Sequence, residues 1–547
     1  SGQAFSASNV TNLSPTQQSQ LGGGDSSKAA NVIKYLSGDS TLEIANGGTF
    51  RNRVSLLGML GTFVNSKPSY SKAPDFGYSG LQSIGSSYKT FVDNNKTNRT
   101  AAVYIGGNAG MFHAFKAADG VELFSYVPRG VYENLYALTT PGMDHRFYVD
   151  GPVVQGDAYL GSAWKNIIVG TTGAGGASIF ALDVTDPTNM SATNVLFDVT
   201  KAESDYLGHV LGNGVIGRIK TGADYEWVYM VGNGVESISN RAALLVISLE
   251  GINKGVVRAI PVGQIWDKTE AGRNGMGGIN VVYGPQRSIV AVYAGDKLGN
   301  LWRFNFAAGM PSNASGFGGS TDPLFTAKDS NNNVQPITTA PVLYPFSNDK
   351  LYIVFGTGKL YDFDDPTNAD AQSLYGILYD PGETSKILTS ELNQVSIVDD
   401  KFNATHDGKR GWVIELDSAE RVIGNPTIAN SLIRISTFKP LASSNVCLGG
   451  GSSRLFSINV INAQGVVQSI AATSATPSPH FEPRQYGRTP TLTPTRAQIR
   501  ENLRGQSSVP LSQCKVTTLS SDKSIGGARQ TACPQTPVLR VWRPLAR

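Results

Sequence analysis

Two short clusters of acidic and amide side chains have the residue types that bind divalent cations. Asp329, Asn331 and Asn333 alternate with the spacing of oxygen ligands in a calcium loop, but the glycine and the bidentate glutamate of such a loop do not follow. The sequence QPITT directly downstream favours an ordinary hairpin. A second cluster surrounds Pro366 and predicts a solvated acidic loop, with a divalent cation site as the alternative. Its members are Asp362, Asp364, Asp365 and Asp370.

Residues with catalytic potential are scattered along the chain. The five histidines show neither HxH nor HExxH spacing, and no GxSxG motif supplies an activated serine. Gly212, Gly214 and Gly217 match GxGxxG, but strand and turn sequence follows, whereas a phosphate-binding loop leads into a helix. We therefore expect no catalytic residues. The histidines are His113, His145, His209, His406 and His480.

The three cysteines, Cys447, Cys514 and Cys533, lack the CxxC spacing of zinc and redox sites. Cys514 and Cys533 form the most local pair and are the candidate disulfide, which would staple a weakly structured tail in an oxidising compartment. Three unpaired thiols are the alternative.

The composition indicates which elements position these residues. The chain has 547 residues, of which 40% are hydrophobic and only 16% charged, together with 61 Gly and 27 Pro. Such a balance favours many short strands joined by turns, so an all-β fold is expected. The longest apolar runs, such as residues 242–249, fall far short of the roughly 18 residues that cross a bilayer, so no transmembrane segment is expected. Ser1 follows no leader and suggests a processed end.

A hairpin pattern recurs along the chain: a β-rich run, a Gly turn, and a second run of alternating apolar residues. Its copies begin 64, 61, 62, 62 and 83 residues apart. A period near 60 with two strong strands per unit is typical of propeller blades, which cover the apolar faces of their neighbours. We predict about seven blades; a pair of β-sandwiches explains the regular period less well. The copies begin at Val103, Ile167, Val228, Val290, Tyr352 and Ile435.

Three regions follow from this pattern. Residues 1–30, rich in Ser, Asn, Gln and Gly, are expected to be a mobile arm, and residues 31–470 form the β-propeller. Residues 471–547 form a basic, Pro-rich extension that could pack on the propeller. Residues 480–547 hold 11 Lys and Arg against three acids, but no interleaved aromatics of the kind that stack on bases, so nucleic acid is not an expected partner.

Several segments occur in a consistent order over most of residues 31–470. They are FRNRVSLLGMLGTFVNSKPSY (50–70), VYIGGNAGMFHAF and FSYVPRGVY (103–132), FYVDGPVVQGDAYLGSAWKNIIVGTTGAGGASIFALDVTDP (147–187), WVYMVGNG (227–234), VYAGDKLGNLWRFNF (292–306), QPITTAPVL (335–343) and GTGKLYD (356–362). Together these segments resemble the C-terminal domain of the PilC/PilY family of type IV pilus-associated proteins.

This resemblance implies a modified quinoprotein-like propeller that supports pilus assembly, the balance of extension and retraction, twitching motility and adhesion. It also implies contact with minor pilins at the pilus tip and with host or abiotic surfaces. The expected location is the cell surface, as part of the pilus tip or associated with the outer membrane, after export through the periplasm.

The sequence departs from the family pattern at one place. Many members carry a calcium loop of the form DxDxDxxxD directly before the YAGD strand. Here those four positions are Val282, Gly284, Gln286 and Val290, none of which offers a carboxylate, and Arg287 adds a positive charge. We therefore predict that no calcium binds in this loop, that no cofactor is needed, and that calcium could bind only at a non-family site.

Two alternatives from other functional classes remain open: a quinone-dependent oxidoreductase and a carbohydrate-binding propeller. A quinone site needs a cation held by carboxylates and amides, and often two adjacent cysteines, which this chain lacks. The strongest blade motif is VYAGDKLGNLWRFNF (292–306), and Asp296 is the only acid within it. In dehydrogenase-like propellers, this position more often fixes a turn than carries chemistry.

Overall fold

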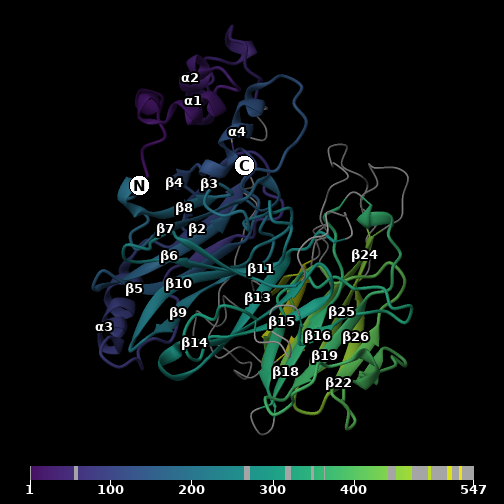
Figure 1. Ribbon diagram of the computed structural model, residues 1–547. Coiled ribbons are helices and arrows are strands. Elements are labelled where there is room, and N and C mark those ends of the chain that lie inside the picture. The colour runs from purple at the N-terminus through teal and green to yellow at the C-terminus, as the bar shows by residue number, and fades with distance from the viewer. Residues whose placement is uncertain are drawn as a thin grey trace. The chain divides into compact units, whose positions relative to one another are not determined.

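Antiparallel sheets dominate the computed structural model (Figure 1). It describes residues 2–53, 60–263, 272–314, 322–346, 350–362, 364–440 and 451–470, together with the backbone of three short strands nearer the C-terminus. The chain divides into two compact units. The first comprises Ser1–Ala294 with Arg303–Asp322, and the second comprises Gly295–Trp302 with Pro323–Arg547.

The first three sheets each contain four antiparallel strands in the simple up-and-down order of propeller blades. The first sheet consists of β1 (Ser69–Ser71), β2 (Ala102–Gly107), β3 (Met111–Lys116) and β4 (Glu122–Tyr126). The second consists of β5 (Val153–Leu160), β6 (Ala163–Thr171), β7 (Ser178–Asp183) and β8 (Val195–Thr200). The third consists of β9 (Val215–Thr221), β10 (Asp224–Gly232), β11 (Ala243–Ser248) and β12 (Val257–Pro261).

The fourth sheet repeats this order, and the next two have five strands each. The fourth contains β13 (Met276–Tyr283), β14 (Ile289–Asp296), β15 (Asn300–Asn305) and β16 (Phe325–Thr326). The fifth contains β17 (Val342–Pro345), β18 (Leu351–Gly356), β19 (Ser373–Tyr379), β22 (Gly411–Glu415) and β20 (Asn393–Gln394). The sixth contains β21 (Lys401–Asn403), β26 (Gln464–Ile470), β25 (Gly451–Asn459), β24 (Leu432–Pro440) and β23 (Thr427–Ala429).

The repeated hairpins predicted from the sequence are confirmed. The first five copies begin within or next to the second strand of five successive sheets, and the sixth begins within β24. Close packing requires glycine at some of these positions: a Cβ at Gly106 would lie 2.2 Å from the Val149 carbonyl oxygen. A seventh sheet has only three short strands, β27 (Thr491–Pro494), β28 (Cys514–Leu519) and β29 (Arg529–Thr531).

An aromatic cluster lies in the core of the first unit. The Trp164 ring on β6 stacks on Tyr78 at a centroid distance of 5.5 Å and lies 5.7 Å from the Trp227 ring. Tyr88 on helix α3 (Gly85–Thr90) approaches Trp164 to 4.5 Å. A single π-helical turn, η4 (Phe91–Lys96), continues α3 and carries its last residue into the protein interior. The core of the second unit is built separately, around Val354, Trp412 and Phe456.

Residues 2–30 differ from the expected arm, because they contain packed helices. Helix η1 (Ala7–Asn12) leads into α1 (Pro15–Leu21), η2 (Ser26–Lys28) and α2 (Ala29–Leu36). The Ser14 side chain and Gln17 cap α1 reciprocally, and Leu13 and Leu21 are buried in one cluster with α4 (Tyr132–Leu135). A few well-spaced apolar residues are therefore sufficient for packing, despite the polar composition. The boundaries at residues 30 and 470 stay predictions.

No helix among the described residues is long and apolar enough to cross a membrane. Most of the predicted extension, residues 471–547, lies outside the described residues, as do Cys447 and Cys533. Cys514 begins β28. The Cys514–Cys533 disulfide therefore stays a prediction.

Candidate functional site

The turn between β13 and β14 lies where the resemblance to the family leads us to expect its calcium loop. Val282 belongs to β13 and Val290 to β14, so only residues 284–288 connect the two strands. The turn is closed by the Gly284 amide, which donates to the Ser288 carbonyl at 2.8 Å. A Cβ at Gly284 would lie 2.4 Å from Cγ1 of Val290, so this position favours glycine. The two strands are therefore joined by a tight hairpin, and the loss of the family calcium loop stays a prediction.

Both oxygens of Gln286 at the tip of this turn already accept hydrogen bonds. Its side-chain Oε1 accepts from the Gln82 amide at 2.8 Å, and its carbonyl oxygen accepts from Nε of Arg218 at 2.9 Å and also from Nη2. Gln286 and Arg287 adopt left-handed backbone conformations, with φ of 56° and 50°. This backbone directs the Gln286 carbonyl toward the guanidinium on β9.

Two guanidinium groups supply the positive charge at the turn. Arg218 is 5% exposed and lies 4.1 Å from the centroid of the Tyr225 ring, and burial lowers its pKa. The pKa of an arginine is so high that it stays cationic under all physiological conditions. Arg287 lies 5.0 Å from the Tyr283 centroid and 5.5 Å from that of Tyr78. The turn is therefore a site of fixed positive charge.

These residues do not fit a calcium ion. Calcium takes six to eight oxygen ligands, of which several are usually carboxylates. The positions that should supply them hold two valines in strands, a glycine, and a glutamine whose oxygens are both engaged. The Arg218 guanidinium instead donates hydrogen bonds to the Gln286 carbonyl oxygen. That the whole chain binds no calcium stays a prediction.

The candidate cation cluster of Asp329, Asn331 and Asn333 forms a hairpin turn in the second unit. Lys328 and Val334 form an isolated antiparallel bridge around it. The Asp329 carboxylate accepts from the Asn331 amide at 2.9 Å, from the Asn333 amide at 2.8 Å and from Nδ2 of Asn333 at 3.0 Å. Slight desolvation raises the pKa of Asp329, but these hydrogen bonds outweigh it and lower the pKa overall. The carboxylate closes its own turn, and a cation at this turn stays untested.

The acidic loop around Pro366 is more ordered than the expected solvated loop. Asp365 is 2% exposed and accepts from the amides of Tyr361 and Asp362, each at 2.8 Å. Lys359 forms ion pairs with Asp362 at 2.6 Å and with Asp365, and Arg421 donates to the Asp365 carbonyl at 2.7 Å. The expectation of a solvated loop is wrong at Asp365. Lys359 and Arg421, which contact it, both lie outside residues 362–370, on which the prediction was based.

Asp296 fixes a turn, as the sequence favoured. This fully buried carboxylate accepts from the Asn300 amide at 2.9 Å and from the Trp302 indole Nε1 at 2.8 Å. The Asn300 side chain donates to it as well, at 3.0 Å. The turn between β14 and β15 is thereby held by the acid that precedes it.

Four of the histidines have separate local contacts. His113 pairs with Glu122 at 2.6 Å, and His209 contacts the Gly173 carbonyl at 3.0 Å. His145 contacts Thr62 and His406 accepts from Gly408. His480 lies outside the described residues. In the part of the chain that the structure describes, no three His, Cys, Asp or Glu side chains are placed to hold a metal ion.

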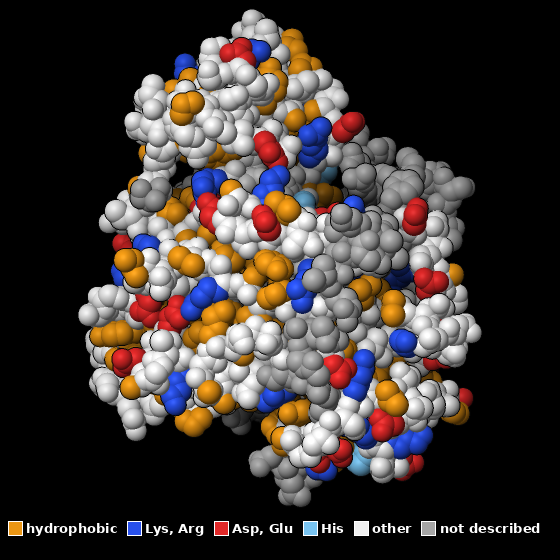
Figure 2. Space-filling model, in the orientation of Figure 1, with side chains coloured by type: hydrophobic (Ala, Val, Ile, Leu, Met, Phe, Trp, Pro, Cys, Tyr) orange, Lys and Arg blue, Asp and Glu red, His pale blue; other side chains and the backbone are white. Residues whose placement is uncertain are grey.

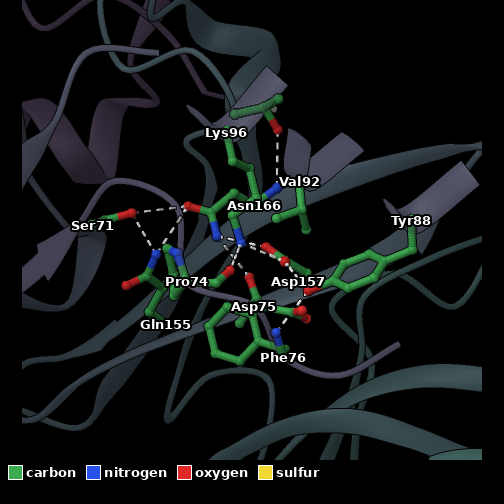
Figure 3. A network of polar contacts seen from close by, with 12 residues as sticks. Ser71, Pro74, Asp75, Phe76, Tyr88, Val92, Lys96, Gln155, Asp157 and Asn166 are labelled. Atoms are coloured by element: carbon green, nitrogen blue, oxygen red, sulfur yellow. Dashed lines mark hydrogen bonds and ion pairs between the residues drawn. The ribbon is translucent and has the colours of Figure 1, made fainter. Parts of the chain in front are cut away.

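One polar cluster was not predicted at all. Lys96, Asp157 and Asn166 are each fully buried in the first unit, and Figure 3 shows the Lys96 and Asn166 side chains directed toward the Asp157 carboxylate. The signal is not local in the sequence: Asp157 and Asn166 become neighbours only through the register of β5 and β6. A buried lysine at the end of a π-helical turn is unusual enough to invite a functional explanation.

Acidic and basic side chains are both scattered among uncharged and apolar ones on the face shown in Figure 2. The excess of basic residues in the sequence falls in residues 480–547, which lie mostly outside the described residues.

Comparison with known proteins identifies the family. The model of the PilY1 β-propeller domain matches residues 60–407, which is more than half of the chain. The chain belongs to the PilY1 β-propeller family. The match covers the first four sheets and most of the fifth, including the β13–β14 turn.

Relatives of this PilY1-family chain are named type IV pilus biogenesis factors. A PilY1 homolog of Xylella fastidiosa is 33% identical over 465 residues, covering 78% of this chain and 31% of that protein. PilY1 of Pseudomonas aeruginosa strain PAK is 36% identical over 381 residues, covering 64% of this chain and 30% of that protein. The chain thus spans about a third of the length of these relatives.

The solved C-terminal domain of Pseudomonas aeruginosa PilY1 has the same fold. The match has a TM-score of 0.60 at 24% identity and covers 84% of this chain and 99% of that one. The β-propeller fold class predicted from the hairpin period is confirmed, and so is the resemblance to pilus-associated proteins.

Proposed function

We propose that this chain is the noncatalytic propeller of a type IV pilus biogenesis factor that supports pilus assembly, the balance of extension and retraction, and twitching motility. The match of residues 60–407 to the PilY1 β-propeller domain carries this proposal. The named relatives are biogenesis factors, and Asp296, the acid of the strongest blade motif, is taken up by turn hydrogen bonds. These observations favour a scaffold over an enzyme.

The regulatory part of the proposal concerns the β13–β14 turn. The family loop would respond to calcium, whereas in this chain the Arg218 guanidinium contacts the Gln286 carbonyl. A guanidinium cannot be removed by chelation or diluted away. We therefore propose that this turn keeps one conformation whatever the calcium concentration, so that pilus function does not depend on calcium here.

The proposed partners are minor pilins at the pilus tip, with host or abiotic surfaces as a second class of target. Rigid blades would present their turns and outer strands, where main-chain pairing and aromatic anchors supply affinity. The proposed location is the cell surface, either at the pilus tip or associated with the outer membrane, after export through the periplasm.

Deletion of the coding region for this chain from its host tests the proposal. We expect loss of surface pili and of twitching, both restored by the intact gene supplied in trans. Immunoblotting of the major pilin in whole cells is the control, because assembly should fail while the pilin is still made. Normal pili and normal twitching in the deletion strain would refute the proposed function.

A further inference from the structure

The buried cluster around Asp157 joins three separate parts of the first unit. Lys96 ends the π-helical turn η4, Asp157 lies on β5, and Asn166 is its direct partner on β6. All three side chains are excluded from solvent. Burying a lysine and a carboxylate together is costly, and apolar residues of similar volume often serve stability equally well. A chemical role is therefore worth deriving from the contacts.

One carboxylate contacts both the amine and the amide nitrogen. Nζ of Lys96 lies 2.6 Å from Oδ2 of Asp157, and Nδ2 of Asn166 lies 2.7 Å from Oδ1 of the same side chain. The Tyr88 hydroxyl donates to Oδ2 at 2.9 Å and fixes the carboxylate further. Figure 3 shows these groups converging on Asp157. A carboxyl group so placed can take a proton from one nitrogen and give it to the other.

The carbonyl oxygen of Asn166 is held by hydrogen-bond donors. Nη1 of Arg99 donates to it at 2.8 Å, and Nε2 of Gln155 and Oγ of Ser71 donate at 3.3 Å. Arg99 can only donate, and Asp157 accepts from the other end of the amide, so the orientation of the Asn166 side chain is fixed. A cationic donor on this oxygen makes the amide carbon more electrophilic and stabilises an oxyanion there.

The surroundings of Lys96 favour the neutral amine that a nucleophile requires. Burial lowers the pKa of Lys96, although the Asp157 charge opposes this shift. Burial likewise raises the pKa of Asp157 against the effect of Lys96. Nζ also lies 4.9 Å from the centroid of the Phe76 ring and donates to the Pro74 carbonyl. Water is excluded, so hydrolysis does not compete.

We propose that Lys96 and Asn166 become joined by an amide bond between their side chains. Nζ of Lys96 attacks Cγ of Asn166, and Asp157 takes a proton from the amine. Arg99 stabilises the oxyanion of the tetrahedral intermediate. Asp157 then gives the proton to Nδ2, the Cγ–Nδ2 bond breaks, and ammonia leaves. An amine and a primary amide thus give a secondary amide and ammonia, with no oxidant, reductant or other reactant.

The bond would tie helix α3 and η4 to the second sheet of the propeller. It would close a covalent loop from residue 96 to residue 166, which includes the whole first sheet beyond β1. Pulling on the chain on either side of this loop could still remove β1, but it would no longer extend β2, β3 and β4. This inference does not depend on the proposed pilus function, because the bond would form between two side chains of the first unit without any partner.

The intact mass of the purified full chain tests the proposal. We expect a mass below that of the sequence by one ammonia, in denaturing solvent. Proteolysis should yield one branched peptide that contains Lys96 and Asn166. Asn65 and Asn108, which both donate to the Asp150 carboxylate, serve as an internal control and should appear in linear peptides. The full sequence mass, or linear peptides at Lys96 and Asn166, would overturn the proposal.

Three variants distinguish the Lys96–Asn166 bond from other reactions that lower the mass of the chain. Lys96→Arg should restore the full mass. If a succinimide elsewhere caused the loss, the mass of this variant would still be one ammonia short, and the assignment would be overturned. Asp157→Asn, which keeps the shape of the catalytic side chain, should stay unlinked while its circular dichroism spectrum matches the wild type. Tyr88→Phe should remain linked. Loss of water with a Lys96–Asp157 branched peptide would overturn the assignment of Asn166.

Discussion

Replacing Arg218 by methionine should loosen the β13–β14 turn. Methionine keeps an apolar stem of similar length but removes both guanidinium donors from the Gln286 carbonyl. A hydrogen bond from a charged group contributes about 1.5–3 kcal/mol. The contact with Tyr225 at 4.1 Å adds about 0.5–1 kcal/mol. We therefore expect the free energy of local opening to fall by about 2–4 kcal/mol.

Hydrogen exchange of individual backbone segments measures this opening directly. The amides of Gly284 and Gln82 both depend on the turn, since they donate to Ser288 and to the Gln286 side chain. Their protection should fall roughly 30- to 800-fold, because each 1.4 kcal/mol is a factor of about ten. Arg146→Met is the matched control, because that exposed arginine makes one long contact, at 3.5 Å. Unchanged protection in Arg218→Met would refute the reasoning.

Two further predictions concern ion pairs and buried carboxylates. Burial raises the pKa of Glu203, but the Arg129 guanidinium at 2.7 Å and the hydrogen bonds from Thr200 together outweigh it and lower the pKa below 4.5. The stabilisation from Glu203 is therefore present above pH 4.5 and is lost as the pH falls through its folded-state pKa. Glu203→Gln should remove less than about 1 kcal/mol of acid dependence from the free energy of unfolding, and an unchanged acid dependence would contradict this. Trp302→Phe removes a donor from Asp296 and should cost about 1.5–3 kcal/mol in calorimetry, whereas an unchanged melting temperature would contradict the turn-fixing role.

The sheets were predictable because local sequence determines them. Alternating apolar residues around Gly turns, as in residues 103–115, place β2 and β3 and repeat in every blade. The strand around Gly217 was also predictable, since the sequence that follows this glycine lacks helical periodicity, and Gly217 lies within β9. The Ser14 and Gln17 pair was a readable helix start, but the polar composition around it suggested an arm instead.

The polar sites were less predictable, because they depend on contacts between distant segments. Nothing near Gln286 indicates that Arg218 reaches its carbonyl, 68 residues away along the chain. Asp365 was expected to be solvated, but contacts with Lys359 and Arg421 bury it. The Lys96 cluster needs the β5–β6 register and the π-helical turn together. Residue types identify candidates for such sites, but the tertiary contacts decide their protonation, burial and partners.

We expect this PilY1-family propeller to support pili without calcium at the β13–β14 turn. The most direct measurement counts surface pili on the deletion strain carrying the intact gene, with calcium present and after chelation, and with viability as the control. We expect the same number of pili in both conditions, since the Arg218 guanidinium keeps its hydrogen bond to the Gln286 carbonyl without calcium. Loss of pili on chelation, reversed by added calcium in viable cells, would contradict it.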